Sequence, residues 1–314
     1  MRTIPATRDL VLAPARRDVP RWRGSPRALA IAEALSAVIV VLMVVASAIG
    51  LLVHGVYHEE PWGREALRGG DLTTLVLAAP ILSTSLILVR RGSRKALVVW
   101  LGALAYGVYD FAYYAFGAAF NDVFLLHVAL LTLSIWALAL GVAGIDAQAV
   151  ADALNPGRSS RWVGGFLALV GAILGGLWIV LSIRFAITGA LMADLPPRGI
   201  HLVFAIDLSL LAPALVVAGV LCWRRKTIGV VFAGVMTVMG ALYQVNLILS
   251  GLFQAAADVP GVKAFPPEGV GLAVGFGVAA ALMFLRRRGA PVDPRSAGRS
   301  TRSLPTEPEH TRTG

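Results

Sequence analysis

The residues of this chain that could do chemistry are ionisable, amide and phenol side chains set inside otherwise apolar segments. Each charged group at the centre of a membrane helix costs about 2.5–3.5 kcal/mol on insertion scales, so such groups normally face the interior of a helix bundle. Almost all of them lie toward the same ends of their segments, with Glu33 as the main exception. We therefore predict transport or binding of a small polar ligand through a pocket lined by Tyr109, Asp110, His127, Arg184, His201, Asp207, Gln244 and Asn246.

Some of the polar residues have a simpler interpretation as helix ends wetted at the membrane surface. Four fit it: His54, Asp71, Asn121 and His201. Four others lie about one to two helical turns deeper: Asp110, Arg184, Asp207 and Gln244. A deep cluster of this kind is either a functional site or a set of structural contacts between helices.

Arg184 cannot lose its charge, so it needs an anionic partner if it is buried in the bundle. It stands five residues before Gly189, and Asp207 stands six residues after His201. A rise of 1.5 Å per residue places the two at depths of about 7 and 9 Å in neighbouring segments. We predict an ion pair between Arg184 and Asp207, with Asp110 as the next partner.

A membrane-embedded enzyme is an alternative, with Asp110, Asp207 and the histidines in acid–base or metal chemistry. His54 and His58 would share a helical face if the helix continued, but Gly55 loosens the turn and zinc needs three or four ligands. We predict no metal and no cofactor. The sequence holds no P-loop, G-x-S-x-G or H-E-x-x-H motif, so it identifies no reaction. A structural or accessory membrane protein is the third alternative.

The composition predicts the elements that position these residues. Hydrophobic residues make up 57% of the chain and charged residues 15%, against about 25% charged in soluble domains. Most apolar segments reach the roughly 20 residues that cross a bilayer as a helix. The sequence predicts an all-α membrane protein, a bundle of eight transmembrane helices at 28–54, 72–89, 96–118, 123–145, 162–189, 201–223, 227–253 and 269–285.

The 28 Lys and Arg residues predict the orientation. One set of loops and tails carries 23 of them and the opposite set carries 4, with Arg184 inside a span. Because positive loops stay in the cytoplasm, both termini should be cytoplasmic and the polar pocket should face outward in a bacterial plasma membrane. This placement also explains the net charge of +10 without a nucleic-acid partner. The expected partner is the lipid bilayer; oligomeric state is left open.

The same pattern predicts the domain organisation. We expect a basic cytoplasmic tail over 1–27, helices over 28–145, a cytoplasmic linker over 146–161, helices over 162–285 and a disordered basic tail over 286–314. Shifting the chain by 134 residues superimposes the first three spans on the fifth to seventh and brings Tyr109 onto Tyr243, although Pro80 and Pro213 miss by one position. Two tandem, parallel four-helix repeats would produce this pattern.

An aromatic-rich stretch from Tyr106 to Phe120 favours a belt of rings at the membrane surface, with Tyr109 as a second option for the pocket. The segment Tyr109–Gly117, then Phe120-Asn121 and 124–127, resembles a stretch of uncharacterised bacterial multipass integral membrane proteins, as do 201–208 and 223–225. That resemblance implies a membrane location and a bacterial origin, and no activity.

Overall fold

The computed structural model describes residues 24–154, 156–190 and 197–285, and for 197–200 the backbone alone. This part of the chain is helical, without a strand, and has eight helices long and apolar enough to span a membrane. The predicted all-α bundle of eight spans is confirmed, and the chain is a multipass membrane protein. The predicted tails, 1–27 and 286–314, lie outside the described residues apart from 24–27.

Six spans are single helices, and two are continuous helices interrupted by a π-helical turn (η). The spans are α1 (Pro26–Leu52), α2–η1–α3 (Pro61–Thr73, Thr74–Ala78, Ala79–Arg90), α4 (Arg94–Gly117), α5 (Phe124–Gly144), α7 (Ser159–Thr188), α8–η2–α9 (Pro197–Ile206, Asp207–Leu211, Ala212–Trp223), α10 (Thr227–Ala256) and α11 (Pro267–Phe284).

The second span is longer than predicted, because α2 begins at Pro61 and not near residue 72. Hydropathy does not reveal this first part, because it carries four charged residues, Arg64, Glu65, Arg68 and Asp71. Glu65 is buried and accepts from Arg64 Nε over 3.0 Å and from Arg68 Nη1 over 3.1 Å. These contacts neutralise the carboxylate, and proline at the first helical position fits the helix start.

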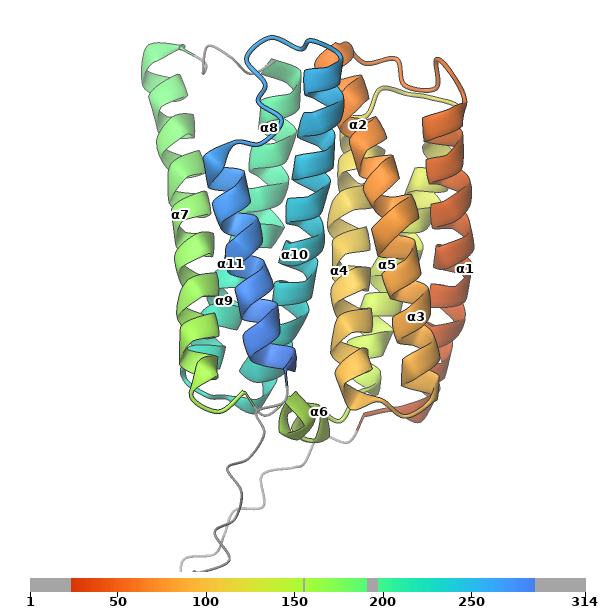
Figure 1. Ribbon diagram of the computed structural model, residues 1–314, viewed down its shortest axis with the longest axis vertical. Helices are drawn as coiled ribbons and strands as arrows, with labels where there is room; N and C mark the ends of the chain where they lie inside the picture. The colour runs from red at the N-terminus through yellow and green to blue at the C-terminus, as the bar shows by residue number, and fades with distance from the viewer. Residues whose placement is uncertain (1–23, 155, 191–196, 286–314) are drawn as a thin grey trace, which may run out of the picture. The chain divides into compact units, whose positions relative to one another are not determined.

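The predicted linker at 146–161 contains a short helix, α6 (Ala147–Leu154). Asp146 Oδ1 accepts from the backbone N–H groups of Gln148 and Ala149, which satisfies donors at the helix start. α6 packs on α4 and α10 and lies across one end of the bundle (Figure 1). We call this the α6 end, and the end that holds the loop 53–60 the distal end.

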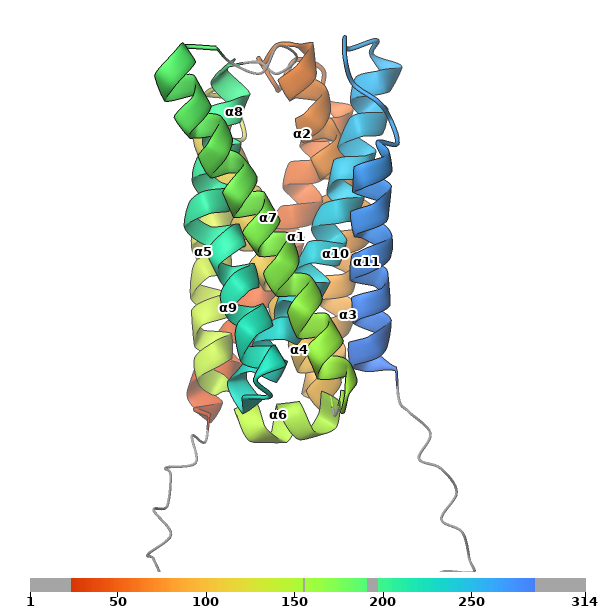
Figure 2. The same ribbon diagram turned by 90° about the vertical axis from the view of Figure 1, so that its left-hand side faces the viewer.

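The helices form two four-helix units with the same internal packing. In the first unit α1 packs against α3 and α5, and α4 packs against α3 and α5. In the second unit α7 packs against α9 and α11, and α10 packs against α9 and α11. Figure 1 shows the units side by side, and Figure 2 shows α7 crossing over α9. Because each unit has an even number of spans, the two are parallel repeats.

The turn after the second helix is the same in both units. Gly92 N donates to Val89 O over 2.8 Å, and 133 residues later Arg225 N donates to Cys222 O over 2.9 Å. The backbone is left-handed at both donors, with φ of +85° at Gly92 and +54° at Arg225. The repeat is therefore structural, and the shift of 134 residues is corrected to 133 over this turn.

Helix α10 joins the units, because it packs against α2 and α4 of the first unit. The approach to α2 is very close: a Cβ added at Gly69 would lie 2.4 Å from Ser250 Cα. Ser250 Oγ lies 2.9 Å from Ala66 O, and Gln254 Nε2 donates to Trp62 O over 2.8 Å. The distal halves of α2 and α10 are thus fixed to each other by backbone contact and two side-chain hydrogen bonds.

Candidate functional site

Two π-helical turns place polar side chains at the level of the site. Pro80 and Pro213 each follow a π turn, and proline has no N–H to donate to the preceding turn. The turns begin at Thr74 and Asp207, residues that the 133-residue shift makes equivalent. Both side chains are buried, and Thr74 Oγ1 lies 3.4 Å from Asp110 Oδ2. π turns of this kind are frequent at functional sites.

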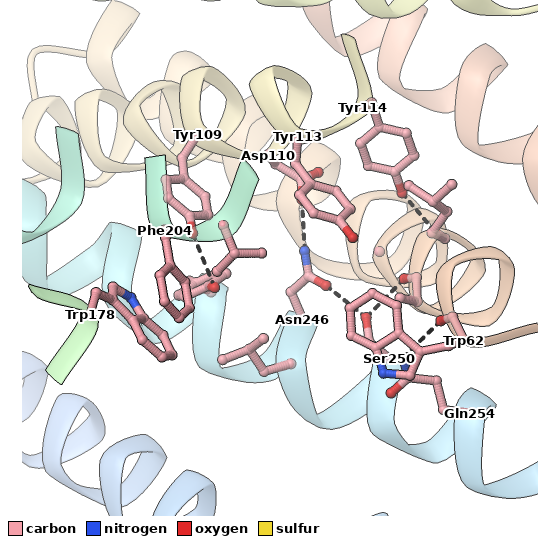
Figure 3. A pocket seen from close by; sticks show the side chains of 16 residues that line it. Trp62, Tyr109, Asp110, Tyr113, Tyr114, Trp178, Phe204, Asn246, Ser250 and Gln254 are labelled. Atoms are coloured by element: carbon pink, nitrogen blue, oxygen red, sulfur yellow. Dashed lines mark hydrogen bonds between the residues drawn. The ribbon is translucent and has the colours of Figure 1, made fainter. Parts of the chain in front are cut away.

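A cavity of about 270 Å³ lies between the two units near these turns. Five helices contribute to its wall: α2, α4, α7, α8 and α10. Figure 3 shows the side chains that line it, which are Trp62, Ala66, Leu67, Gly70, Tyr109, Asp110, Tyr113, Tyr114, Trp178, Val203, Phe204, Tyr243, Asn246, Leu247, Ser250 and Gln254. Aromatic rings form much of the wall, and a few amide, hydroxyl and carboxyl groups interrupt it.

Asp110 is the carboxylate in this wall. Asn246 Nδ2 donates to Asp110 Oδ1 over 2.7 Å and lies 2.9 Å from Tyr106 Oη. Asn246 Oδ1 in turn lies 3.1 Å from Ser250 Oγ. The resulting row of polar groups from α4 to α10 is visible in Figure 3. Thr74 and Tyr106 also hydrogen-bond to Asp110, whose two oxygens accept about four bonds in all, so the carboxylate keeps an acceptor position for a further donor.

Tyr109 forms the wall toward the α6 end. Its hydroxyl donates to Asp207 Oδ1 over 2.6 Å, and Trp178 Nε1 donates to Asp207 Oδ2 over 2.8 Å. The Tyr109 and Tyr243 hydroxyl oxygens lie 3.1 Å apart. Trp178 also stacks on Phe204 with the ring centroids 4.1 Å apart. Asp207 therefore fixes two aromatic side chains of the wall without lining the cavity itself.

A second buried cluster lies between α1, α2, α4 and α5. Tyr57 donates to Asp71 Oδ2 over 2.6 Å, and Tyr114 Oη lies 3.4 Å from Asp71 Oδ1. Burial and the neighbouring Asp71 raise the pKa of the Tyr57 phenol, so it stays protonated and donates. His127 packs against Tyr114 with centroids 4.6 Å apart, and its ring nitrogens have no hydrogen-bond partner among the described residues.

The buried carboxylates share one electrostatic property. In the part of the chain that the structure describes, Asp71, Asp110 and Asp207 form no ion pair with Lys, Arg or His. Their partners are neutral phenol, amide, hydroxyl and indole donors. The cavity lining likewise contains no Lys, Arg or His. A buried carboxylate without a cation is costly, and of these three Asp110 lines the cavity itself.

The structure brings together only some of the eight predicted pocket residues. Tyr109, Asp110 and Asn246 line the cavity, and Asp207 stands behind Tyr109. Gln244 is buried outside the lining, with Oε1 unpartnered among the described atoms, and His127 belongs to the second cluster. His201 and Arg184 are exposed and do not line the cavity.

The predicted ion pair of Arg184 with Asp207 or Asp110 was wrong. Arg184 appears in none of the ion pairs of the described residues, and its side chain is exposed. The reason is helical phase, because Arg184 follows Trp178 by six residues and lies about 120° away around α7. Trp178 faces Asp207, so Arg184 faces outward, where a long side chain can reach the membrane surface.

The surface interpretation of the aromatic stretch was also wrong for most of its members. Tyr106, Tyr109, Phe111 and Tyr114 are buried, and only Phe116 and Phe120 are largely exposed. Asp71, given as a wetted helix end, is buried with 2% of its surface exposed. The aromatic wall residues outside this stretch were missed: Trp62, Trp178, Phe204 and Tyr243. Of these four, Tyr243 carried a signal in the sequence, its alignment with Tyr109 in the 134-residue repeat.

The histidine pair does not share a helical face. α1 ends at Leu52, and Gly55 has a left-handed φ of +83°, so the helix does not continue from His54 to His58. His58 Nδ1 lies 3.3 Å from Phe120 O. Within the described ranges, no three His, Cys, Asp or Glu side chains are placed to hold a metal ion.

No protein-family model, curated protein or solved structure matches this chain.

Proposed function

We propose that this membrane protein binds a small polar ligand in the cavity between its two units. The observation that carries the proposal is the position of Asp110, Asn246 and Ser250 in one aromatic-walled cavity where the repeats meet. Concave sites with apolar walls and a few converging polar groups are typical of ligand binding. Sites between repeated units of four spans or more are also where membrane carriers hold their ligands.

The Lys and Arg distribution supports an outward orientation for this site. The turns 90–95 and 224–226 lie with α6, and the opposite loops are poor in basic residues. The positive-inside rule then places the α6 end in the cytoplasm and the distal end outside a bacterial plasma membrane. Asp110 and Asn246 belong to the distal half of the bundle, so the proposed ligand comes from outside the cell.

Binding is favoured over transport because the space on the α6 side of Tyr109 is apolar. A cavity of about 410 Å³ touches Tyr109 there, and its remaining lining is aliphatic or aromatic, including Leu101, Val231 and Met239. Glu33, the one acid predicted near the α6 end of a span, pairs with Arg90 over 3.2 Å. Among the described residues, the lining of this second cavity offers no polar side chain besides Tyr109 to carry a ligand toward the α6 end.

The proposal is tested by the reactivity of a cysteine in the cavity wall. Cys222 is buried and is replaced by serine to give a background without thiols. Ser250→Cys then introduces one nearly isosteric thiol at the lining. Small membrane-impermeant methanethiosulfonates, one cationic and one anionic, are added to intact cells and to purified protein. We expect labelling of Ser250→Cys in both preparations by mass spectrometry.

Ser134→Cys is the matched control, because Ser134 is fully buried on α5 and lines none of the cavities described here. It should stay unlabelled under the same conditions. An unreactive Ser250→Cys in the purified protein would refute a ligand-accessible cavity. Labelling in purified protein and in inside-out vesicles alone would keep the cavity and reverse its orientation.

A further inference from the structure

We propose that the ligand of this cavity is a small organic cation, an ammonium ion with short apolar substituents. The inference rests on the proposed ligand-binding function and names the chemical class that this site would take. It follows from three properties of the wall: its aromatic faces, its unpaired carboxylate and its lack of basic groups.

The aromatic wall suits a cation. Trp62, Tyr109, Tyr113, Trp178 and Tyr243 all line the cavity and come from four different helices. The faces of such rings carry negative partial charge and attract ammonium groups, most strongly when water is excluded. Figure 3 shows the Trp62 and Tyr113 rings beside the Asp110–Asn246–Ser250 row. A cation at this row would contact π faces and hydrogen-bond acceptors together.

The charge balance points the same way. Asp110 is 4% exposed, and its hydrogen-bond partners Asn246, Thr74 and Tyr106 are all neutral. Asp207 lies one hydrogen bond behind Tyr109, so a second carboxylate adds to the negative field at the wall. A cationic ligand would supply the positively charged partner that these two carboxylates lack among the described residues. An anionic ligand would meet these carboxylates with no Lys, Arg or His in the lining to offset them.

The volume limits the size of the cation. The cavity of about 270 Å³ falls just below the range of roughly 300–1,000 Å³ that pockets for drug-sized ligands occupy. A simple amine or a trimethylammonium compound fits this space. Tyr113 Oη has no hydrogen-bond partner among the described residues and lines the cavity, so it can accept from, or donate to, a polar substituent on the ligand.

The test compares three probes of nearly the same shape and different charge. Choline is the cation, 3,3-dimethylbutan-1-ol is its neutral carbon analogue, and 3,3-dimethylbutanoate is an anion. Each is titrated by calorimetry into the purified full chain in detergent at low ionic strength. Because desolvated ring faces and the Asp110 carboxylate both attract a cation and not its neutral analogue, choline should bind at least about tenfold more tightly than the alcohol. The anion should bind more weakly than either.

Two variants test whether the preference for choline over the alcohol arises in this cavity. Asp110→Asn keeps the shape of the wall and its rings but removes the carboxylate, and should reduce the ratio of choline to alcohol affinity about threefold or more. Trp62→Leu removes one aromatic face at the rim and should weaken choline about threefold or more while leaving the alcohol nearly unchanged. Asp122→Asn and Trp162→Leu are the matched controls, because both side chains are exposed and neither lines the cavity. Both controls should keep the wild-type ratio.

The outcomes separate the ligand class from the proposed function. If choline shows no preference over the alcohol, or the anion binds best, the cation proposal fails. If no probe binds although Ser250→Cys is labelled, the cation proposal also fails and the ligand-accessible cavity stands. If no probe binds and Ser250→Cys is unreactive, both proposals fail. A wild-type ratio in Asp110→Asn and Trp62→Leu together would place choline elsewhere and overturn the assignment.

Discussion

Tyr109 and Tyr243, 134 residues apart in the chain, are in direct contact: their hydroxyl oxygens lie 3.1 Å apart and their ring centroids 4.7 Å apart in an edge-to-face arrangement. The 134-residue shift aligns the two tyrosines, whereas the 133-residue shift of the turn before α4 and α10 pairs Tyr109 with Leu242, so the tyrosines are equivalent to within one residue. Equivalent residues touch each other only at the axis that relates two copies, as in a two-fold dimer interface. The pseudo-two-fold axis between the units therefore passes close to these rings, which line the candidate cavity at its end toward α6.

The two tyrosines should differ in their contribution to stability, because only Tyr109 also donates to a buried carboxylate. Tyr109→Phe removes a donor to Asp207 and should cost about 1.5–3 kcal/mol, whereas Tyr243→Phe removes a neutral contact and should cost about 0.5–1.5 kcal/mol. Thermal unfolding of both purified variants in one detergent measures the difference. Equal losses would mean that Asp207 does not depend on the Tyr109 hydroxyl.

The number and approximate positions of the spans could be predicted because they follow from properties of whole segments and not of single contacts. Apolar length and the distribution of Arg and Lys define eight spans without reference to tertiary structure. The start of α2 was not predicted, because Arg64, Glu65 and Arg68 lower the hydropathy of this segment. Their charges are paired only in the folded protein, where both arginines contact Glu65. α6 was missed although Asp146 before an apolar-periodic stretch is a helix-start signal.

The sequence predicted how deep in the bundle the site residues lie, but not the direction in which each side chain points. Sequence position gave the level of Asp110, Asp207 and Asn246 within the bundle, and these three do lie at or behind one cavity. It could not give the rotation of each helix, which decides that Trp178 faces inward and Arg184 outward. Helix rotation is set by packing against neighbours, and a single sequence holds that information only weakly.

The close approach of α2 and α10 should make Gly69 intolerant of any side chain. A Cβ there would lie 2.4 Å from Ser250 Cα, so Gly69→Ala forces the two units apart at the cavity. Overpacking of this kind costs about 1–3 kcal/mol, and we expect a lower melting temperature. Gly176→Ala on α7 is the control, because nothing lies within 4 Å of that position. A Gly69→Ala variant as stable as this control would contradict the close contact.

The orientation proposed from charge can be measured with topology reporters. Fusions after residues 92, 158 and 226 should place the reporter in the cytoplasm, where alkaline phosphatase is inactive and a fluorescent protein folds. Fusions after residues 57, 121 and 262, in the loops of the distal end, should give the opposite pattern. Cytoplasmic activity from a fusion after residue 57 would reverse the proposed orientation.

Asp207 should be sensitive to substitution while Arg184 should not, although both are charged residues in neighbouring spans. Asp207→Asn weakens the contacts with Tyr109 and Trp178 and should lower stability by about 1–3 kcal/mol. Arg184→Gln changes an exposed side chain without an ion pair in the described chain and should be nearly neutral. The double variant should equal the sum of the single changes, because independent sites add. Recovery of stability in the double variant, by more than about 0.5 kcal/mol over that sum, would instead show that Arg184 and Asp207 interact in solution.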